Sequence, residues 1–340
     1  MLLEQVPNCP ICNGNGQTEI KDATDPFLAI EGKWGYKRCL DCHSLYMDPR
    51  PVPLEIPNLY PKTYYTHDSM ELDPFKSQSM TFFSQLWHKI WIASLCSMGY
   101  KSQLEGKKLK SSVVGNFFCL HPTVNLEAKR QCRFLEAKRG KILDVGCGNG
   151  QFLYFMKELQ WEVEGIEPDP LAARKVIENG IKVIQSTIEE VDLSKDTYDA
   201  ITLSHVIEHL RDPVSIIKKL VSALKPGGKL ISISPNPTGT LAKRFLKSWR
   251  GLEPPRHLVL VSPQGFWHIQ QELEIKGEVF TLWRSEAIMF AQSKMIKTQS
   301  RITSIPSLSF SDILYGYFWG PWKTFFFPFS GEEVVFIAKK

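Results

Sequence analysis

The sequence has 340 residues, of which 43% are hydrophobic and 23% are charged, and its formal net charge is +5. This is the composition of an ordinary globular protein, long enough for two or three domains with sizeable cores. The basic excess is far smaller than that of a dedicated nucleic-acid-binding protein, so we do not expect nucleic acid as the partner. It suits a phosphorylated small molecule, an anionic membrane surface or plain solvated lysines.

The opening residues and the lengths of the apolar runs bear on where the protein works. The opening stretch MLLEQVPNCP turns polar at once, unlike a secretory leader. No uninterrupted apolar run in the sequence approaches the roughly 18 residues of a membrane span. We therefore expect a cytoplasmic protein, a setting in which disulfides are rare, and the eight cysteines need another explanation.

Two short cysteine elbows lie near the front of the chain. Cys9 and Cys12 form one Cys-x-x-Cys pair, and Cys39 and Cys42 form the second. Each elbow aims two sulfurs at one point, and two elbows complete the tetrahedral four-sulfur set that structural zinc prefers. Iron fits the same ligands, whereas a redox pair more naturally stands alone. We predict a structural Zn2+ that holds together a lobe formed by residues 1–50. Because four cysteines fill its coordination sphere, the metal has no open position for catalysis.

Residues 51–138 are predicted to hold a connector and a helical lid region. The proline-rich stretch DPRPVPLEIPNLYPKTYY is typical of an extended linker, and helical patterns follow it. Two stretches rich in Trp and Phe, 82–95 and 313–329, carry interleaved lysines. They can pack as core, cover a sugar as an aromatic lid, or touch a membrane surface.

Strands and helices alternate within residues 139–340. This order predicts a Rossmann-like, doubly wound and mostly parallel sheet, with its site at the carboxyl ends of the strands. One helix is expected to start at Asp212, whose side chain can accept a hydrogen bond as the N-cap. Pro213 follows at the first helical position, where the N–H group that proline lacks would have no partner within the helix. The final GEEVVFIAKK is expected to return to the same sheet as a strand. Elsewhere we expect strands at 141–146, 162–167, 182–185, 199–205 and 229–236, and helices at 151–160, 171–180 and 212–225.

A glycine-rich loop follows the first of these strands. Gly146, Gly148 and Gly150 stand between the strand and a helix, where glycine lets the backbone approach a ligand closely. The spacing differs from a dinucleotide fingerprint, which needs its third glycine one position later. Asp144 suits the positively charged amino-acid end of a ligand, and Glu167 suits two ribose hydroxyls but repels a 2′-phosphate. A ligand with a ribose, an ammonium group and no pyrophosphate is S-adenosylmethionine (SAM).

These motifs resemble those of the class I SAM-dependent methyltransferases. The stretches DVGCGNG, GIEPD, DTYDAITLSHVIEHLRDP and LKPGGKLISISPN look like the successive motifs of that family, over about residues 141–236. The resemblance implies that the three glycines line SAM, with Asp144 near its methionine end and Glu167 on its ribose. It also implies that Thr187 and Ile188 flank the adenine. The front half, CPIC…RCLDCHSLYMDPRP…YPKTYY, is similar to zinc-ribbon methyltransferases of bacterial polysaccharide and sugar modification, although His43 stands where they usually have glycine.

Two regions offer a histidine for proton transfer, which suits that residue near neutral pH. His205, Glu208 and His209 follow one strand and share a face; they can hold a divalent metal, or form a hydrogen-bonded turn under the cofactor. His257 is the other candidate, as general base or acceptor anchor, with a packed histidine as the alternative. Its neighbour Arg256 can meet a phosphate or carboxylate, or form an ordinary salt bridge.

The sequence therefore predicts a SAM-dependent methyltransferase with a structural zinc ribbon, whose catalytic candidates are His257 and His205. We expect it to methylate an oxygen, or less readily a carbon, of a sugar nucleotide or of a glycan or lipid-linked precursor in polysaccharide biosynthesis. The alternatives are an rRNA or tRNA base methyltransferase and a non-catalytic zinc-ribbon binding module. The predicted partner is a small-molecule or glycan acceptor, with peripheral membrane contact as a further expectation; the oligomeric state is not indicated.

Overall fold

The computed structural model describes residues 1–60, 82–138, 140–283, 286–302 and 306–340. The proline-rich linker and the start of the predicted helical region lie partly outside these residues. The chain divides into two compact units, which we describe separately. The first comprises Met1–Tyr64, Leu203–Val221 and Ser232–Lys339, and the second Tyr65–Thr202, Ser222–Ile231 and Lys340.

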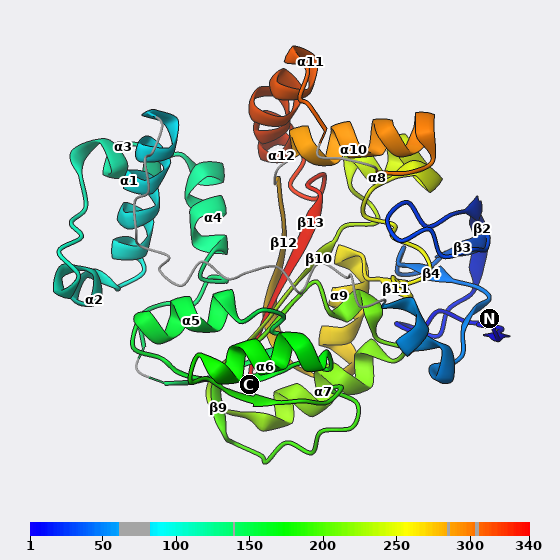
Figure 1. Ribbon diagram of the computed structural model, residues 1–340, viewed down its shortest axis with the longest axis horizontal. Helices are drawn as coiled ribbons and strands as arrows, with labels where there is room; N and C mark the ends of the chain where they lie inside the picture. The colour runs from blue at the N-terminus through cyan, green and yellow to red at the C-terminus, as the bar shows by residue number, and fades with distance from the viewer. Residues whose placement is uncertain (61–81, 139, 284–285, 303–305) are drawn as a thin grey trace. The chain divides into compact units, whose positions relative to one another are not determined.

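Seven strands form the main sheet, in the order β12-β13-β10-β9-β6-β7-β8 (Figure 1). Strands β6, β7 and β8 pair in parallel, whereas β12 runs antiparallel to β13. The Rossmann-like, mostly parallel sheet predicted from the sequence is confirmed, and the final strand belongs to it as expected. Its strands are β6 (Lys141–Val145), β7 (Glu162–Ile166), β8 (Lys182–Ile184), β9 (Tyr198–Ser204), β10 (Leu224–Pro235), β12 (Lys276–Leu282) and β13 (Glu333–Lys339).

Three helices connect the parallel strands: α5 (Gln151–Glu158), α6 (Pro170–Glu178) and α7 (Pro213–Ala223). Asp169 caps α6 by accepting from the backbone N–H groups of the first turn, and Pro170 occupies its first position. A Cβ on Gly150, which opens α5 in the left-handed region, would lie only 2.7 Å from Val176 of α6. Glycine at this position therefore allows the start of α5 to approach α6 closely, while α5 contacts β7 and α6 contacts β8.

The second unit also contains the helices α1 (Phe82–Ser97), α2 (Lys101–Gly106), α3 (Val113–Cys119) and α4 (Pro122–Arg130). Ile90, Trp91 and Leu95 of α1 are buried, so this part of the first aromatic stretch packs as core. The helical pattern expected to continue to residue 138 ends at Arg130, because Arg133 and Phe134 adopt left-handed backbone conformations. This turn positions the Arg133 side chain for the contacts described below.

The first unit begins with the cysteine-containing lobe, shown in blue in Figure 1. Its sheet has the order β11-β4-β3-β2, so a strand that follows His257 pairs with the front of the chain. The lobe elements are β1 (Leu3–Glu4), β2 (Gly16–Ala23), β3 (Trp34–Cys39), β4 (Leu45–Met47), β5 (Arg50–Pro51), η1 (Pro53–Leu59) and β11 (Val259–Leu260). β1 pairs with β5.

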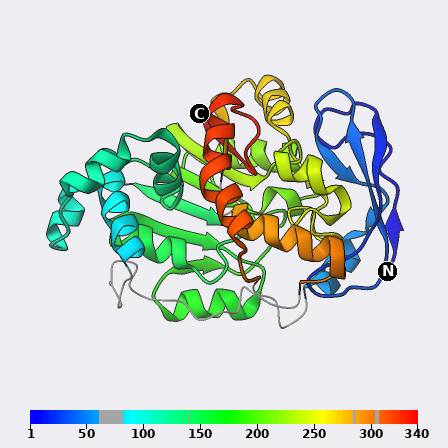
Figure 2. The same ribbon diagram turned by 90° about the horizontal axis from the view of Figure 1, so that it is seen from above.

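The rest of the first unit is mostly helical. Helix α10 packs against α11 and the π-helical turn η5, and η5 continues into α12 (Figure 2). Trp319, Phe326 and Phe327 of the second aromatic stretch are exposed. Within the described residues, none of the helices is long and apolar enough to cross a membrane. The elements are η3 (Ile207–His209), α8 (Thr240–Phe245), η4 (Leu246–Ser248), α9 (Pro263–Glu272), α10 (Glu286–Gln299), α11 (Phe310–Leu314), η5 (Tyr315–Trp319) and α12 (Gly320–Phe326).

Candidate functional site

The glycine loop lies at the carboxyl end of β6 in the second unit. The backbone N–H groups of Gly146 and Cys147 donate to the carbonyl of Ile166 at 2.8 and 3.1 Å, which ties the loop to β7. Gly148 has a φ of +55°, and a Cβ there would meet no described atom within 4 Å. The loop is thus held at its start and open above Gly148, where a ligand can approach the backbone.

Glu167 directly follows β7 and is almost fully buried. Its two carboxylate oxygens accept from the backbone N–H groups of Gly148 at 2.7 Å and Asp169 at 2.9 Å. Burial raises the pKa of Glu167, although these two hydrogen bonds favour the ionised form. A carboxylate offers about four lone-pair positions, so it retains acceptor capacity for two ribose hydroxyls.

Asp144 lies fully buried beneath the loop. Its Oδ1 forms an ion pair with Arg133 and accepts a hydrogen bond from Thr202 Oγ1 at 2.9 Å. The same guanidinium donates to Thr202 Oγ1 at 2.7 Å and stacks 3.7 Å above the ring of Phe152. Burial raises the pKa of Asp144, and the positive charge of Arg133 opposes this shift. Asp144 therefore meets an arginine of the chain itself, which the sequence analysis did not single out.

The four elbow cysteines come together in the first unit. The Sγ atoms of Cys9 and Cys42 are 3.6 Å apart, those of Cys12 and Cys39 are 3.4 Å apart, and all four ligand atoms lie within 4.8 Å of one another. A tetrahedral zinc site with Zn–S bonds of about 2.3 Å has sulfurs about 3.8 Å apart. The donor set and its dimensions are therefore compatible with a small zinc-ribbon lobe.

The two elbows have the same backbone geometry. The residue after each second cysteine, Asn13 or His43, has a φ of 58° or 59°. This left-handed conformation explains why glycine usually follows the last cysteine in the zinc-ribbon methyltransferases that the sequence resembles. All eight cysteines are free thiols, so none forms the disulfides that the sequence analysis disfavoured.

His205 follows the last residue of β9 with a left-handed φ of 57°. Its backbone N–H donates to Ile233 at 2.8 Å, and its ring nitrogens lie 3.3 Å from Glu208 and 3.1 Å from Glu333. Burial opposes a positive charge here, but the hydrogen bonds to the two carboxylates raise the pKa of His205 to about 9. A non-glycine residue held in this conformation, with its side chain 36% exposed, is typical of functional sites.

His257 has a different environment. It is buried, and its Nδ1 lies 2.9 Å from the carbonyl of Gly251. Burial lowers its pKa to about 4, in spite of the nearby Glu253 carboxylate. Arg256 is also buried and pairs with Asp25 at 2.8 Å and with Glu253 at 3.1 Å. Arg256 therefore forms an internal salt bridge, the second of its two predicted alternatives.

Glu208, His209 and His257 bring potential ligand atoms within 4.8 Å of one another. The rings of His209 and His257 meet edge to face, with centroids 4.8 Å apart. His209 Nδ1 lies 3.0 Å from the hydroxyl of Tyr60 and 3.1 Å from the carbonyl of Arg256. The structure thus joins the two regions that the sequence analysis had treated as separate histidine candidates.

Comparisons with known proteins agree with the geometry of the glycine loop. A family model described as a methyltransferase domain matches residues 124–273. The ubiquinone biosynthesis O-methyltransferase of Xanthomonas axonopodis pv. citri is 35% identical over 185 residues, which cover 47% of this chain and 75% of that protein. The chain belongs to the class I SAM-dependent methyltransferases. The corresponding enzyme of Vibrio parahaemolyticus is 39% identical over 95 residues, covering 26% of this chain and only 40% of its own length.

Solved structures of SAM-dependent methyltransferases are also similar. One from Archaeoglobus fulgidus has a TM-score of 0.42 and 22% identity, covering 60% of this chain and 87% of that chain. Phosphoethanolamine N-methyltransferase 2 of Haemonchus contortus, in complex with SAM, has a TM-score of 0.43 and 18% identity, covering 62% of this chain and 50% of that chain.

The second unit of this methyltransferase offers groups that fit SAM. The open space above Gly148 and the unused lone pairs of the Glu167 carboxylate suit a ligand that contains a ribose. After β8, Thr187 is exposed and Ile188 is buried. The individual roles of these residues toward SAM remain predictions.

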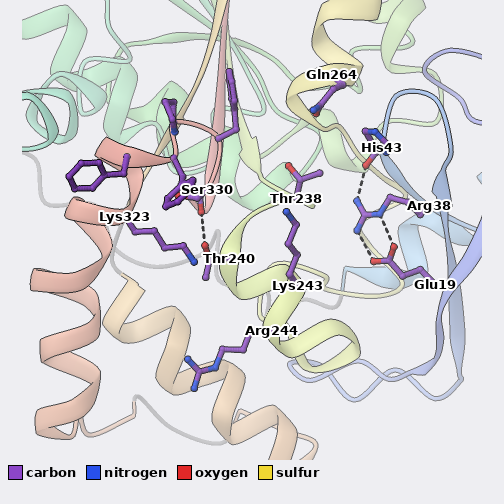
Figure 3. Close-up of a pocket in the computed structure, with 14 residues that line it drawn as sticks. Glu19, Arg38, His43, Thr238, Thr240, Lys243, Arg244, Gln264, Lys323 and Ser330 are labelled. Atoms are coloured by element: carbon purple, nitrogen blue, oxygen red, sulfur yellow. Dashed lines mark hydrogen bonds and ion pairs between the residues drawn. The ribbon is translucent and has the colours of Figure 1, made fainter.

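A cavity of about 1120 Å³ lies in the first unit of the methyltransferase (Figure 3). It begins just beyond the carboxyl end of β10, with Thr238 and Thr240 in its wall. The cavity could not be predicted from the sequence, because its walls come from the lobe, from the segments around α8 and α12, and from α9. Its charged lining side chains are Arg38, Lys243, Arg244, Lys323 and Glu19.

Glu332 is a buried carboxyl group beside α8 whose protonation should control stability. It accepts from the backbone N–H of Leu241 at 2.8 Å, and burial raises its pKa to about 8. The pKa of a glutamate in the unfolded chain is about 4.3. Between these values the unfolded chain has lost a proton that the folded protein keeps, so stability falls as pH rises, by about 1.4 kcal/mol per pH unit. Urea unfolding at a series of pH values should give a slope that is less steep by this amount in Glu332→Gln than in the wild type; parallel curves would contradict the assignment.

Proposed function

We propose that the protein transfers a methyl group from SAM to a hydroxyl oxygen of a sugar nucleotide or a lipid-linked glycan precursor. The observation that carries this choice is the cavity lined by four cationic side chains and one carboxylate. Such a lining favours an anionic acceptor, and sugar precursors carry phosphates. The relatives named as O-methyltransferases support oxygen as the methylated atom.

A second candidate acceptor is a phenolic hydroxyl of a quinone precursor. It is supported by the 35% identity to a ubiquinone biosynthesis O-methyltransferase. That alignment covers 47% of the chain, and the cation-lined cavity lends it no support, because the ring of a phenolic acceptor needs no phosphate partner.

We assign the cofactor and the metal as follows. Asp144, Glu167 and the glycine loop would hold SAM, with Thr187 and Ile188 beside its adenine. The four elbow cysteines would hold a structural Zn2+ in a ribbon over residues 1–50. Residues 51–138 would connect the ribbon and form a helical lid, and residues 139–340 would form the catalytic domain with its acceptor-side insertions.

Bound SAM would supply a methyl group on a positively charged sulfur, which leaves as a neutral thioether. Among the chain's own residues, His205 is the better placed of the two candidate histidines. It keeps a partly exposed ring between two carboxylates. Because the two carboxylates raise the pKa of His205 to about 9, its ring can take the hydroxyl proton only in the deprotonated form, and turnover should rise with pH toward about 9. His257 is buried and meets the His209 ring edge to face, so we assign it to holding His209 in place.

The proposal is tested by methyl transfer from radiolabelled SAM to separated pools of nucleotide sugars, lipid-linked glycans, phenolic quinone precursors and RNA. We expect label in one of the two sugar pools. His205→Gln should lower turnover by about 10²- to 10⁴-fold while SAM affinity stays unchanged. His268→Gln, on α9 and outside this cluster, is the matched control and should retain turnover.

Label confined to the phenolic pool would select the second candidate. Label confined to RNA would overturn both, and so would a protein that binds SAM but labels no pool at all. Full turnover in His205→Gln would remove His205 from the mechanism while leaving the acceptor assignment in place.

A further inference from the structure

We propose that the cavity of the first unit is a binding site for the diphosphate group of the acceptor. The inference rests on the proposed function and names the part of the acceptor that the protein recognises away from the methylated oxygen. Nucleoside diphosphate sugars and polyprenyl diphosphate glycans share this group, and the test below separates them.

The cationic side chains of the cavity differ in how much of their charge is already compensated. Arg38 donates to Glu19 at 2.8 and 2.7 Å and to the carbonyls of His43 and Pro237 at 2.7 and 3.0 Å. The positive charge of Arg38 is therefore offset by Glu19, and its hydrogen bonds connect the segments that form this wall of the cavity. Arg244 stacks over Phe290, 4.8 Å from the ring centroid, and Figure 3 shows it turned away from the other cations.

Lys243 and Lys323 are the two amines available to a ligand. Figure 3 shows Lys243 extending from α8 toward Thr238 and Lys323 extending from α12 toward Thr240. Within the described residues, neither amine forms a hydrogen bond or a contact ion pair, although the charge of Lys243 acts on Glu19 and that of Lys323 acts on Glu332. Both amines line the same cavity, and a diphosphate bound there would supply negative charge and acceptor oxygens to them.

The floor of the cavity is held by fixed hydrogen bonds rather than by mobile surface groups. Asn236 Nδ2 donates to the carbonyls of Phe329 and Gly331 at 3.1 and 2.7 Å. Thr240 donates through its backbone N–H and its hydroxyl to the carbonyl of Ser330, at 3.1 and 3.2 Å. These contacts fix the segment after β10 against the segment before β13. The backbone that leads into α8, the helix that carries Lys243, is therefore held in place.

One wall of the cavity is aromatic. Phe326, Phe327 and Phe329 line it, and the first two are 66% and 63% exposed. Exposed aromatic rings and ammonium groups that line one cavity suit a ligand in which a phosphate group is joined to an apolar or planar part. A nucleobase and a prenyl chain both meet this description, whereas inorganic phosphate satisfies only the lysines.

The test is calorimetric binding of inorganic pyrophosphate, uridine diphosphate and farnesyl diphosphate to the full-length protein without SAM. We expect at least one organic diphosphate to bind more tightly than pyrophosphate, because it also contacts the rings. Lys243→Met combined with Lys323→Met should weaken that binding by about 10- to 100-fold, since two charge-assisted contacts are lost. Lys247→Met is the matched control, because this lysine is exposed on η4 outside the cavity lining; its binding should stay within about twofold.

Tighter binding of uridine diphosphate would identify a nucleotide-linked acceptor, and tighter binding of farnesyl diphosphate a lipid-linked one. The inference is overturned if none of the three probes binds, or if the double variant binds as the wild type does. Thermal unfolding of every variant shows whether the first unit is folded, since SAM affinity reports only on the second unit. If the sugar pools are methylated but no diphosphate binds, the proposed function stands without this site. If a diphosphate binds but no pool is labelled, the site stands without the proposed function.

Discussion

Arg133→Met should lower the free energy of unfolding by about 3–5 kcal/mol, as expected when one partner of a buried ion pair is removed. Arg133 has a side chain only 12% exposed, and its partner Asp144 is fully buried. Without the guanidinium, Asp144 keeps a single hydrogen bond from Thr202, and its Oδ2 has no hydrogen-bond donor among the described residues. Methionine can still pack against Phe152, so the change in stability reports the loss of the positive charge rather than the loss of packing. Denaturant unfolding measures the change.

The pH dependence of the variant supplies a second readout. Burial already raises the pKa of Asp144, and removing the positive charge raises it further. A carboxyl group whose pKa is higher in the folded state destabilises the fold increasingly as pH rises above its unfolded value. The deficit of Arg133→Met should therefore be smallest in acid and grow toward neutral pH.

Two further variants make this prediction specific to the buried pair. Arg133→Met combined with Asp144→Asn should recover part of the stability, because no unpaired charge remains. Arg174→Met removes an exposed arginine that pairs with Glu178 at 3.1 Å on the surface of α6, and should change stability by less than about 0.5 kcal/mol. Equal losses in Arg133→Met and Arg174→Met would contradict the assignment of Asp144 as an arginine-paired carboxylate.

The parts of the fold that could be predicted from the sequence are those specified locally. The short apolar run of β6, the glycine loop after it and the capping residues Asp169 and Ser262 act within a few positions of the chain. Asp212 likewise accepts from the backbone N–H of Ser215 at 3.0 Å, as its N-cap pattern predicts. Each of these signals fixes an element before any distant part of the chain is in place.

The parts that could not be predicted depend on distant partners. The helix expected around residue 133 consists of good helix formers, yet the ion pair with Asp144 and the stacking on Phe152 favour a left-handed turn there. Strand β12 lies at the edge of the sheet, and its first three residues are exposed, so only its second half has the apolar character of a strand. Strand β11 has only two residues, and its pairing with β4 bridges more than half of the chain. The cavity has the same origin, because its walls come from four separated segments.

Removal of the predicted zinc should have a larger effect than any single hydrogen bond in the protein. We expect one zinc ion per chain, and we expect chelation or Cys39→Ser to unfold the lobe, since structural zinc supplies about 10 kcal/mol or more in small zinc domains. Cys39 is fully buried, so serine there places an unpartnered hydroxyl among the sulfurs. Elemental analysis and thermal unfolding measure the two effects. Cys96→Ser, which lies outside the cluster, is the control and should keep both the metal and the melting temperature.

The consequences should reach beyond the lobe, because its strands hold part of the candidate site. The Tyr36 hydroxyl donates to the carbonyl of His257 at 2.9 Å, and β4 pairs with β11. Ser262, which caps α9, donates from its backbone N–H to Ser44 Oγ at 3.2 Å and from its hydroxyl to the carbonyl of Cys42. Loss of the metal should therefore free the segment that carries His257 and abolish methyl transfer.

SAM affinity should change little after zinc removal, because the glycine loop, Glu167 and the Arg133–Asp144 pair belong to the second unit. The metal-free protein is thus expected to bind SAM but to transfer no methyl group. A chelated protein that keeps its activity, or a Cys39→Ser variant with the melting temperature of the wild type, would show that the four sulfurs meet without a metal. In that case hydrogen bonds and packing, rather than zinc, would hold the lobe against the strand that follows His257.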